Sequence, residues 1–250
     1  PRIVSIKKTH KNRMQVSRLI AQIHLPSEKE IRLFLIRFFI VGLIGFALPV
    51  TQPLFRLLTP YTLLLSFLLI LMYELTANRK RGVGYFLLFI GVVYILSFFV
   101  EVIGVNTGVL FGHYRYGNTL GVKIAHTPLL IGVNWVLLAL GAAAVSNRLS
   151  SSLGFSETRY IGTIFRIITG AFLMLTVDFV LERVAPWMDM WSWQTVRVPG
   201  RNYLAWFLLS LIFQSYYVLV KIQQRTRIAA TLFILEFFFL LLLFFYIRFL

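Results

Sequence analysis

Acidic residues inside long apolar stretches are the residues of this sequence best suited to chemistry. Five of the nine acids lie within or at the end of such a stretch: Glu74, Glu101, Asp178, Glu182 and Glu236. An ionised carboxylate in a lipid bilayer costs roughly 2.5–3.5 kcal/mol on insertion scales, so an acid there indicates a function by default. These five positions are therefore the first candidates for a site.

Three of the acids are expected at one membrane side. Glu101 ends one apolar stretch, and Asp178 and Glu182 end another, where their four-residue spacing places them on one face of a helix. A carboxylic acid in an apolar pocket keeps its proton near neutral pH, because burial disfavours the charged form. One such acid beside an ionised one would provide a proton donor and a proton acceptor. The structural alternative is a set of ion pairs with arginines. The arginines available for it are Arg115, Arg183 and Arg201.

The other two acids fit different roles. Glu74 precedes the basic turn at 79–81, which favours a structural role. Glu236 lies in the middle of a phenylalanine-rich stretch, where helix packing and a proton path are both open. We do not expect either residue to be catalytic.

Histidine and asparagine side chains add to the possible chemistry. His113 exchanges protons near neutral pH and could transfer one. His113 and His126 could bind a metal together with the acids, but neither their spacing nor the number of ligands is diagnostic, and we expect no metal. Asn134 lies inside an apolar stretch, where its amide could position a water or join two helices. Cysteine is absent, as are dinucleotide-binding, P-loop and Ser-His-Asp signatures, and we expect no cofactor.

The apolar stretches themselves determine the fold class. Hydrophobic residues make up 58% of the chain, charged residues 14%, and the mean hydropathy is +0.80. A soluble domain cannot bury that much apolar surface, whereas a bilayer solvates it. We predict an all-α polytopic membrane helix bundle over 31–250, preceded by a basic cytoplasmic or interfacial tail over 1–30. The expected spans are 31–50, 57–77, 84–104, 127–147, 160–182, 203–221 and 228–248.

The basic residues predict the orientation of these spans. The chain has 25 Lys and Arg against 9 Asp and Glu, but the basic residues lie mainly between spans, so nucleic-acid binding is not expected. If seven helices alternate, fifteen basic residues fall on one side of the membrane and seven on the other. Because positive segments stay in the cytoplasm, we predict a cytoplasmic N-terminus and an outer C-terminus.

Two long connections, about 105–126 and 183–202, fall on the predicted outer side. The first is rich in glycine and aromatic residues, and the second contains three tryptophans. An aromatic belt at the membrane interface is one interpretation, but loops of this length usually have a function. The two connections also resemble each other. Each follows a helix that ends in an acid and leads into the next helix through proline, asparagine and tryptophan. These residues are Pro128, Asn134 and Trp135 in the first, and Pro199, Asn202 and Trp206 in the second.

Two motifs resemble a known family. The segment FVEVIGVNTGVLFGHYRYGNTLG (99–121) with TPLLIGVNW (127–135) resembles the membrane carotenoid 1,2-hydratases of the bisanhydrobacterioruberin hydratase type. DFVLERVAPWMDMWSWQ (178–194) with VPGRNYLAWF (198–207) is similar to the family's second motif. This sequence departs from that motif by Arg183 after the glutamate and by Met188-Asp189-Met190 before the tryptophans. The resemblance covers roughly 60–220.

The resemblance implies addition of water to the terminal 1,2 double bond of an acyclic (ψ-end) carotenoid, such as lycopene or γ-carotene. The product is a tertiary alcohol, and no cofactor is needed. We then expect Glu101, Asp178, Glu182 and His113 to be catalytic. The residues expected to bind the substrate are Asn106, Tyr114, Tyr116, Asn134, Trp135, Trp187, Trp191, Trp193 and Asn202. Membrane lipid, the carotenoid and water are the expected partners, with other carotenoid biosynthesis enzymes as further ones. The expected location is the bacterial cytoplasmic (inner) membrane.

Other functions fit the same residues. A proton-coupled transporter or lipid-handling protein could use the acids, although the sequence has no convincing inverted repeat. A membrane anchor could use the loops to bind a partner protein. A carotenoid end-group cyclase or isomerase would also begin by protonating the alkene, and would differ in what captures the cation.

Overall fold

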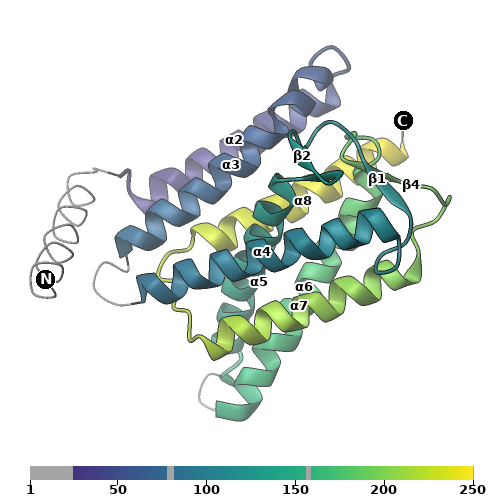
Figure 1. Cartoon of the computed structure of the whole chain (residues 1–250). Coiled ribbons are helices and arrows are strands. Elements are labelled where there is room, and N and C mark those ends of the chain that lie inside the picture. The colour runs from purple at the N-terminus through teal and green to yellow at the C-terminus, as the bar shows by residue number, and fades with distance from the viewer. Residues whose placement is uncertain (1–24, 78–81, 156–158, 250) are drawn as a thin grey trace, which may run out of the picture.

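The structure, a computed structural model, describes residues 25–77, 82–155 and 159–249 as a bundle of long helices (Figure 1). The helices are α2 (Glu28–Ala47), α3 (Gln52–Ala77), α4 (Val83–Thr107), α5 (Leu130–Ser152), α6 (Arg159–Val184), α7 (Gly200–Leu219) and α8 (Ile228–Arg248). The predicted all-α polytopic bundle is confirmed. Residues 1–24 of the predicted tail lie outside the described residues, and α2 already begins inside the tail's last three positions.

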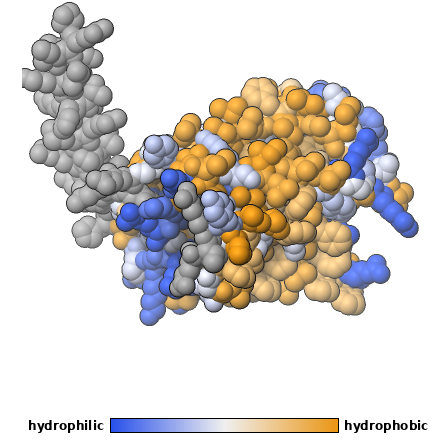
Figure 2. All heavy atoms as spheres, turned by 90° about the horizontal axis from the view of Figure 1, so that it is seen from below, coloured by the Kyte–Doolittle hydropathy of each residue, from blue (hydrophilic) through white to orange (hydrophobic). Residues whose placement is uncertain are grey.

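Six of the described helices, α3 to α8, are long and apolar enough to cross a membrane. Their outward faces carry large apolar side chains, and Leu57, Phe99 and Ile161 are each more than half exposed. Figure 2 shows a broad hydrophobic band with hydrophilic residues gathered at its two ends. Soluble proteins rarely expose so large a continuous apolar surface. The chain is therefore a multi-pass membrane protein.

Helix α2 differs from the other expected spans. A capping box starts it: the Ser27 N–H donates to the Glu30 carboxylate at 2.7 Å, and the Glu30 N–H donates back to the Ser27 hydroxyl at 3.3 Å. Charged residues occupy its first turns, and Arg37 lies further along. Helix α2 is not among the six helices that are long and apolar enough to span a membrane, although it packs along α8 and α3. The predicted orientation depends on whether α2 crosses, and it stays a prediction.

Helix α5 forms the core of the bundle. It contacts α3, α4, α6, α7 and α8, and 83% of its most apolar stretch is buried inside the protein. Small residues make this packing possible, because they let helix backbones approach closely. A Cβ added to Gly141 would lie 2.6 Å from the Cβ of Phe233 on α8. The α2–α3 hairpin lies along one flank of this core, and α6 and α7 lie along the other (Figure 1).

Short strands join the two long connections. Strands β1 (Tyr114–Tyr116) and β4 (Trp191–Trp193) pair antiparallel, and β2 (Lys123–Ile124) pairs with β3 (Thr127–Pro128). The β1–β4 ribbon continues into the loops, where the Gly117 N–H donates to the Met190 carbonyl at 2.9 Å. The prediction that both connections lie at the same end of the bundle is therefore confirmed. The strands themselves were not predicted.

Glu74 has the structural role predicted for it, and the basic turn at 79–81 lies outside the described residues. Its side chain is fully buried. It accepts hydrogen bonds from the backbone N–H groups of Arg225 and Thr226, each at 3.0 Å, and from the Thr226 hydroxyl at 2.6 Å. Glu74 thereby fixes the turn between α7 and α8.

Candidate functional site

Glu101 lies near the end of α4 and is enclosed by aromatic hydrogen-bond donors. The hydroxyls of Tyr114 and Tyr116 each donate to its Oε2 at 2.6 Å, and the indole N–H of Trp135 donates to Oε1 at 3.0 Å. Alternation along β1 points both tyrosines to one side of the strand, while Arg115 between them faces outward. Burial raises the pKa of both tyrosine hydroxyls, so they stay protonated and keep donating.

Glu182 lies near the end of α6 and has a matching environment. The indole N–H groups of Trp191 and Trp193 donate to its Oε2 at 3.1 and 2.6 Å, and the amide of Asn202 donates to Oε1 at 3.2 Å. Strand β4 supplies its two donors as β1 does for Glu101. Each glutamate thus accepts three hydrogen bonds. An ionised carboxylate only accepts hydrogen bonds, whereas a protonated one would also need an acceptor for its own O–H.

Asp178 lies one helical turn from Glu182 and has a different environment. The Asn202 amide donates to its Oδ2 at 3.3 Å, and so bridges the two acids. Its Oδ1 is buried and has no hydrogen-bond partner within the described part of the chain. This oxygen is therefore a place where a proton can be held. Buried polar groups without partners are rare and usually have a function.

Two of the three arginines that could have paired with these acids bond elsewhere. Arg115 donates to the Ser192 hydroxyl at 3.4 Å. Arg183 donates to the Phe179 carbonyl and lies over the Phe179 ring, with 3.6 Å between the guanidinium carbon and the ring centroid. Among the described residues, the hydrogen-bond donors at the three acids are ring hydroxyls, indoles and one amide, and none is a guanidinium group.

Glu101 and Glu182 line one small cavity beneath the strands. Its volume is about 20 Å³, slightly more than the roughly 10–15 Å³ that one water molecule requires. The other described residues that line it are Phe111, Tyr114, Tyr116, Ile131, Trp191, Trp193, Asn202 and Trp206. We call the three acids, their hydrogen-bond donors and this cavity the carboxylate site. It offers two carboxylates, a third acid with a free oxygen, and aromatic rings around a water-sized space.

A local two-fold relationship underlies the carboxylate site. In the β1–β4 pair, Tyr114 lies opposite Trp193 and Tyr116 opposite Trp191, so exchanging the strands reproduces the pattern. The helices follow it too, because Trp135 and Trp206 each come seven residues after a proline and stack on each other. The resemblance between the two connections therefore has a structural counterpart.

The two halves differ at two polar positions. Four residues before its glutamate, the α4 half has Ser97 where the α6 half has Asp178. Three residues after its proline, the α5 half has Ile131 where the α7 half has Asn202. The additional acid and the additional amide both belong to the α6–α7 half, so that half carries the excess of reactive groups.

Several residues expected at the site lie elsewhere. His113 is exposed, with its imidazole packed against the Gly108 backbone, and it does not line the cavity. Asn106 is also exposed and donates to the carbonyls of Val102 and Ala125, so it holds the loop to α4. The structure therefore does not bring either side chain to the three acids.

Trp187 and Asn134 also face other parts of the protein. Trp187 packs against Phe46 and Tyr246, and its carbonyl accepts a hydrogen bond from Arg56. Asn134 is buried and faces a separate cavity. The other expected residues, namely Tyr114, Tyr116, Trp135, Trp191, Trp193 and Asn202, are all at the carboxylate site.

Sequence reasoning missed Phe111, Ile131 and Trp206 as lining residues. The sequence did indicate Trp206, because Trp206 occupies the same position after Pro199 as Trp135 does after Pro128. Phe111 and Ile131 are apolar residues in apolar surroundings, and the sequence contains nothing that would single them out. Among the described residues, no group of three His, Cys, Asp or Glu side chains is arranged to hold a metal ion.

Fold and site together define a polytopic helical membrane protein with carboxylates buried among aromatic donors beneath its loops. A family model described as carotenoid biosynthesis protein matches residues 58–249, more than three-quarters of the chain. The chain belongs to this family, which confirms the resemblance expected from the motifs.

A curated relative adds detail to this assignment. Over 116 residues the chain is 29% identical to the bisanhydrobacterioruberin hydratase of Haloarcula japonica. The alignment covers 45% of this chain and 38% of the relative, so the chain matches well under half of that protein's length. No solved structure matches the chain.

Proposed function

We propose that this chain adds water to the terminal 1,2 double bond of an acyclic ψ-end carotenoid, such as lycopene or γ-carotene, and forms a tertiary alcohol. One observation carries the proposal: an acid with a free oxygen, Asp178, is bridged by Asn202 to Glu182, which lines a cavity the size of one water. Family membership and the printed name of the relative support carotenoid hydration as the reaction.

The proposed roles follow from the hydrogen bonds. Asp178 has a free oxygen and gives its proton to the less substituted alkene carbon, where a C–H bond forms. The tertiary carbon becomes a cation. A water in the cavity attacks this carbon, the C–O bond forms, and the released proton passes to the Glu182 carboxylate. Return of that proton to Asp178 resets the site, so the net change is addition of one water. Glu101 lines the same cavity and helps to orient this water.

The aromatic residues stabilise the cation. Ring faces attract positive charge, by about 2 kcal/mol or more when both groups are desolvated. Tyr114, Tyr116, Trp191 and Trp193 place four rings around the cavity. Burial in the membrane also suits the substrate, because a long polyene dissolves in the bilayer and not in water.

The test is expression in a bacterium that accumulates lycopene, followed by mass analysis of the carotenoid extract. The wild-type chain is expected to produce a carotenoid heavier by one water. Asp178→Asn and Glu182→Gln are expected to abolish this product while the protein still inserts at wild-type levels. Asp189→Asn is the matched control, because Asp189 lies at the same end of the bundle but accepts from the Asn118 N–H outside the cavity. Unchanged hydration in both site variants would remove these acids from the mechanism.

The same extracts separate the alternative reactions. A cyclase or isomerase would change the chromatographic behaviour of the carotenoid without changing its mass. A proton-coupled transporter would leave the carotenoid unchanged and carry proton-dependent flux in vesicles. We place the protein in the bacterial cytoplasmic membrane, among the other enzymes that make and consume its carotenoid.

A further inference from the structure

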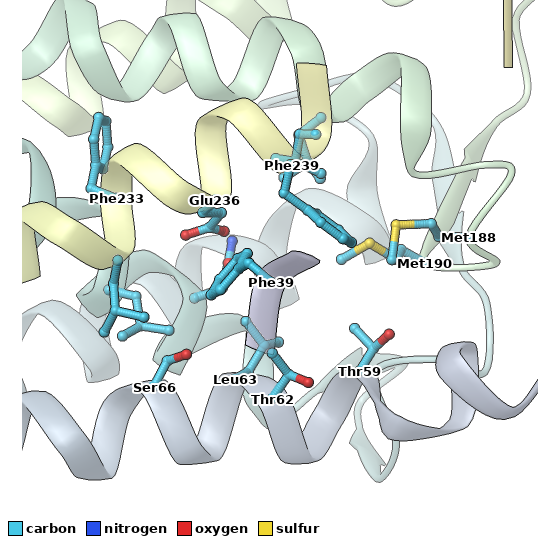
Figure 3. Close-up of a pocket in the computed structure, with 15 residues that line it drawn as sticks. Phe39, Thr59, Thr62, Leu63, Ser66, Met188, Met190, Phe233, Glu236 and Phe239 are labelled. Atoms are coloured by element: carbon cyan, nitrogen blue, oxygen red, sulfur yellow. The ribbon is translucent and has the colours of Figure 1, made fainter. Parts of the chain in front are cut away.

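A second cavity lies on the other side of the helices that form the carboxylate site. It has a volume of about 80 Å³ and lies between α2, α3 and α8 on one side and α5 and α6 on the other. Figure 3 shows Glu236 of α8 among apolar side chains that include Phe39, Phe233 and Phe239. The cavity is thus an apolar space inside the membrane region with an acid on its wall. We call it the Glu236 cavity.

Two polar groups in the Glu236 cavity lack partners. Asn134 is 3% exposed, and its amide nitrogen has no hydrogen-bond partner among the described residues. No hydrogen bond or ion pair involves Glu236 within the same part of the chain. An unsatisfied buried donor or acceptor costs about 1–3 kcal/mol. Two such groups at one cavity, one on α5 and one on α8, therefore point to a ligand that satisfies both.

The Glu236 cavity shares a wall with the carboxylate site. Two pairs of consecutive residues form this wall, and each pair contributes one lining residue to each cavity. The pairs are Leu181 with Glu182 on α6, and Met190 with Trp191 at β4. On α5, Asn134 lines the Glu236 cavity, and the next residue, Trp135, donates to Glu101 at the carboxylate site. The two spaces are therefore neighbours.

The free groups match a hydroxyl. The Asn134 amide nitrogen donates, and a carboxyl oxygen of Glu236 accepts, so together they satisfy the oxygen and the hydrogen of one alcohol. A pure hydrocarbon would leave both groups unpaired. The remaining wall is mostly leucine, phenylalanine and methionine, which suits a branched apolar chain.

We propose that the Glu236 cavity binds the end of a branched apolar chain that carries one hydroxyl group. We take this ligand to be the tertiary alcohol formed at the carboxylate site, and in that respect the inference rests on the proposed function. The cavity then receives the hydroxylated end after reaction, and Glu236 and Asn134 are binding residues. They take no part in the proton transfers of hydration.

The experiment measures the melting temperature of the purified full chain in detergent. A branched dimethyloctanol with a tertiary hydroxyl is compared with dimethyloctane, the hydrocarbon of the same skeleton. A ligand that binds only the folded state raises the melting temperature. The alcohol is expected to raise it by several degrees, and the hydrocarbon is not. Equal shifts with both compounds, or no shift with the alcohol, would overturn the proposal.

Variants locate the binding. Glu236→Leu and Asn134→Leu are each expected to lose the shift caused by the alcohol. Glu236→Gln is expected to keep it, because an amide still accepts and donates. Glu101→Gln is the matched control and is also expected to keep it, since Glu101 lies at the carboxylate site. A shift that persists in both leucine variants would place the alcohol elsewhere and overturn the proposal. If one of the two leucine variants does not unfold cooperatively, the other leucine variant is used to locate the binding.

The two proposals fail in different ways. A wild-type chain that hydrates lycopene but does not bind the alcohol overturns the cavity assignment alone. A chain that binds the alcohol through Glu236 and Asn134 but leaves lycopene unchanged overturns the proposed hydration. The cavity would then hold a hydroxylated chain made by another enzyme.

Discussion

The indole rings of Trp135 and Trp206 stack face to face, with centroids 3.8 Å apart and planes 19° from parallel. Each tryptophan comes seven residues after a proline that precedes its helix, so the stack joins equivalent points of the two halves of the site. The Trp135 N–H also donates to Glu101 at 3.0 Å. The stack therefore holds α5 and α7 together and, through Trp135, orients a carboxylate.

Replacing Trp135 by Phe separates these two contributions. Trp135→Phe keeps a ring in the stack and removes a hydrogen bond to a carboxylate, worth about 1.5–3 kcal/mol. If Glu101 orients water, hydration is expected to fall roughly ten- to hundredfold in kcat/KM. Trp206→Phe is the matched control and is expected to lower the melting temperature with a much smaller effect on rate. Equal rates in the two variants would argue against a role for Glu101.

Asn202 is predicted to be the asparagine on which activity depends most. Asn202→Ala removes the donor shared by Asp178 and Glu182 and leaves both acids short of a partner. Hydration is expected to drop at least tenfold, since one hydrogen bond to a charged group is worth about 1.5–3 kcal/mol. Asn106→Ala is the comparison, because Asn106 lies in the family motif but bonds only to backbone carbonyls on an exposed surface. The measurement is the hydration rate of membranes that contain equal amounts of the Asn202→Ala or the Asn106→Ala variant.

The sequence predicted the helices well because each helix corresponds to a long run of apolar residues. The sequence also predicted that Glu101, Asp178 and Glu182 lie at one end of the bundle, because acids at the ends of helices that run in the same direction lie at the same membrane face. It could not predict that Trp187 and Asn134 turn away from these acids, because the side chain's direction depends on helix rotation and loop path. The β1–β4 pairing was equally hidden, since YRY and WSW are too short to show alternation reliably.

Gly141 is expected to control the packing of α5 against α8. Gly141→Ala would bring a Cβ within 2.6 Å of the Phe233 Cβ, so one helix must shift, and overpacking of this kind costs about 1–3 kcal/mol. The melting temperature in detergent should fall. Gly91→Ala is the matched control in α4, because no heavy atom lies within 4 Å of the added Cβ there. Its melting temperature should be unchanged or slightly higher, since alanine favours helix. A stable Gly141→Ala variant would show that α8 moves freely against α5.

The two tyrosines of β1 predict how the site responds to alkali. Burial raises the pKa of Tyr114 and Tyr116 in the folded protein, whereas a tyrosine in the unfolded chain titrates near its ordinary value of about 10. The folded state therefore holds these protons more tightly. Their contribution to stability is complete below pH ~10 and is lost as the pH rises above it. Tyrosinate absorbance should show these hydroxyls titrating only as the loops unfold.

A double variant, Tyr114→Phe with Tyr116→Phe, tests this assignment. It has no such hydroxyls to protect, so its melting temperature should fall less steeply above pH ~10 than that of the wild type. It should also be less active at neutral pH, because Glu101 loses two of its three donors. If the double variant and the wild type lose stability in parallel above pH ~10, the alkaline transition belongs to other groups, and the two hydroxyls are not held by burial.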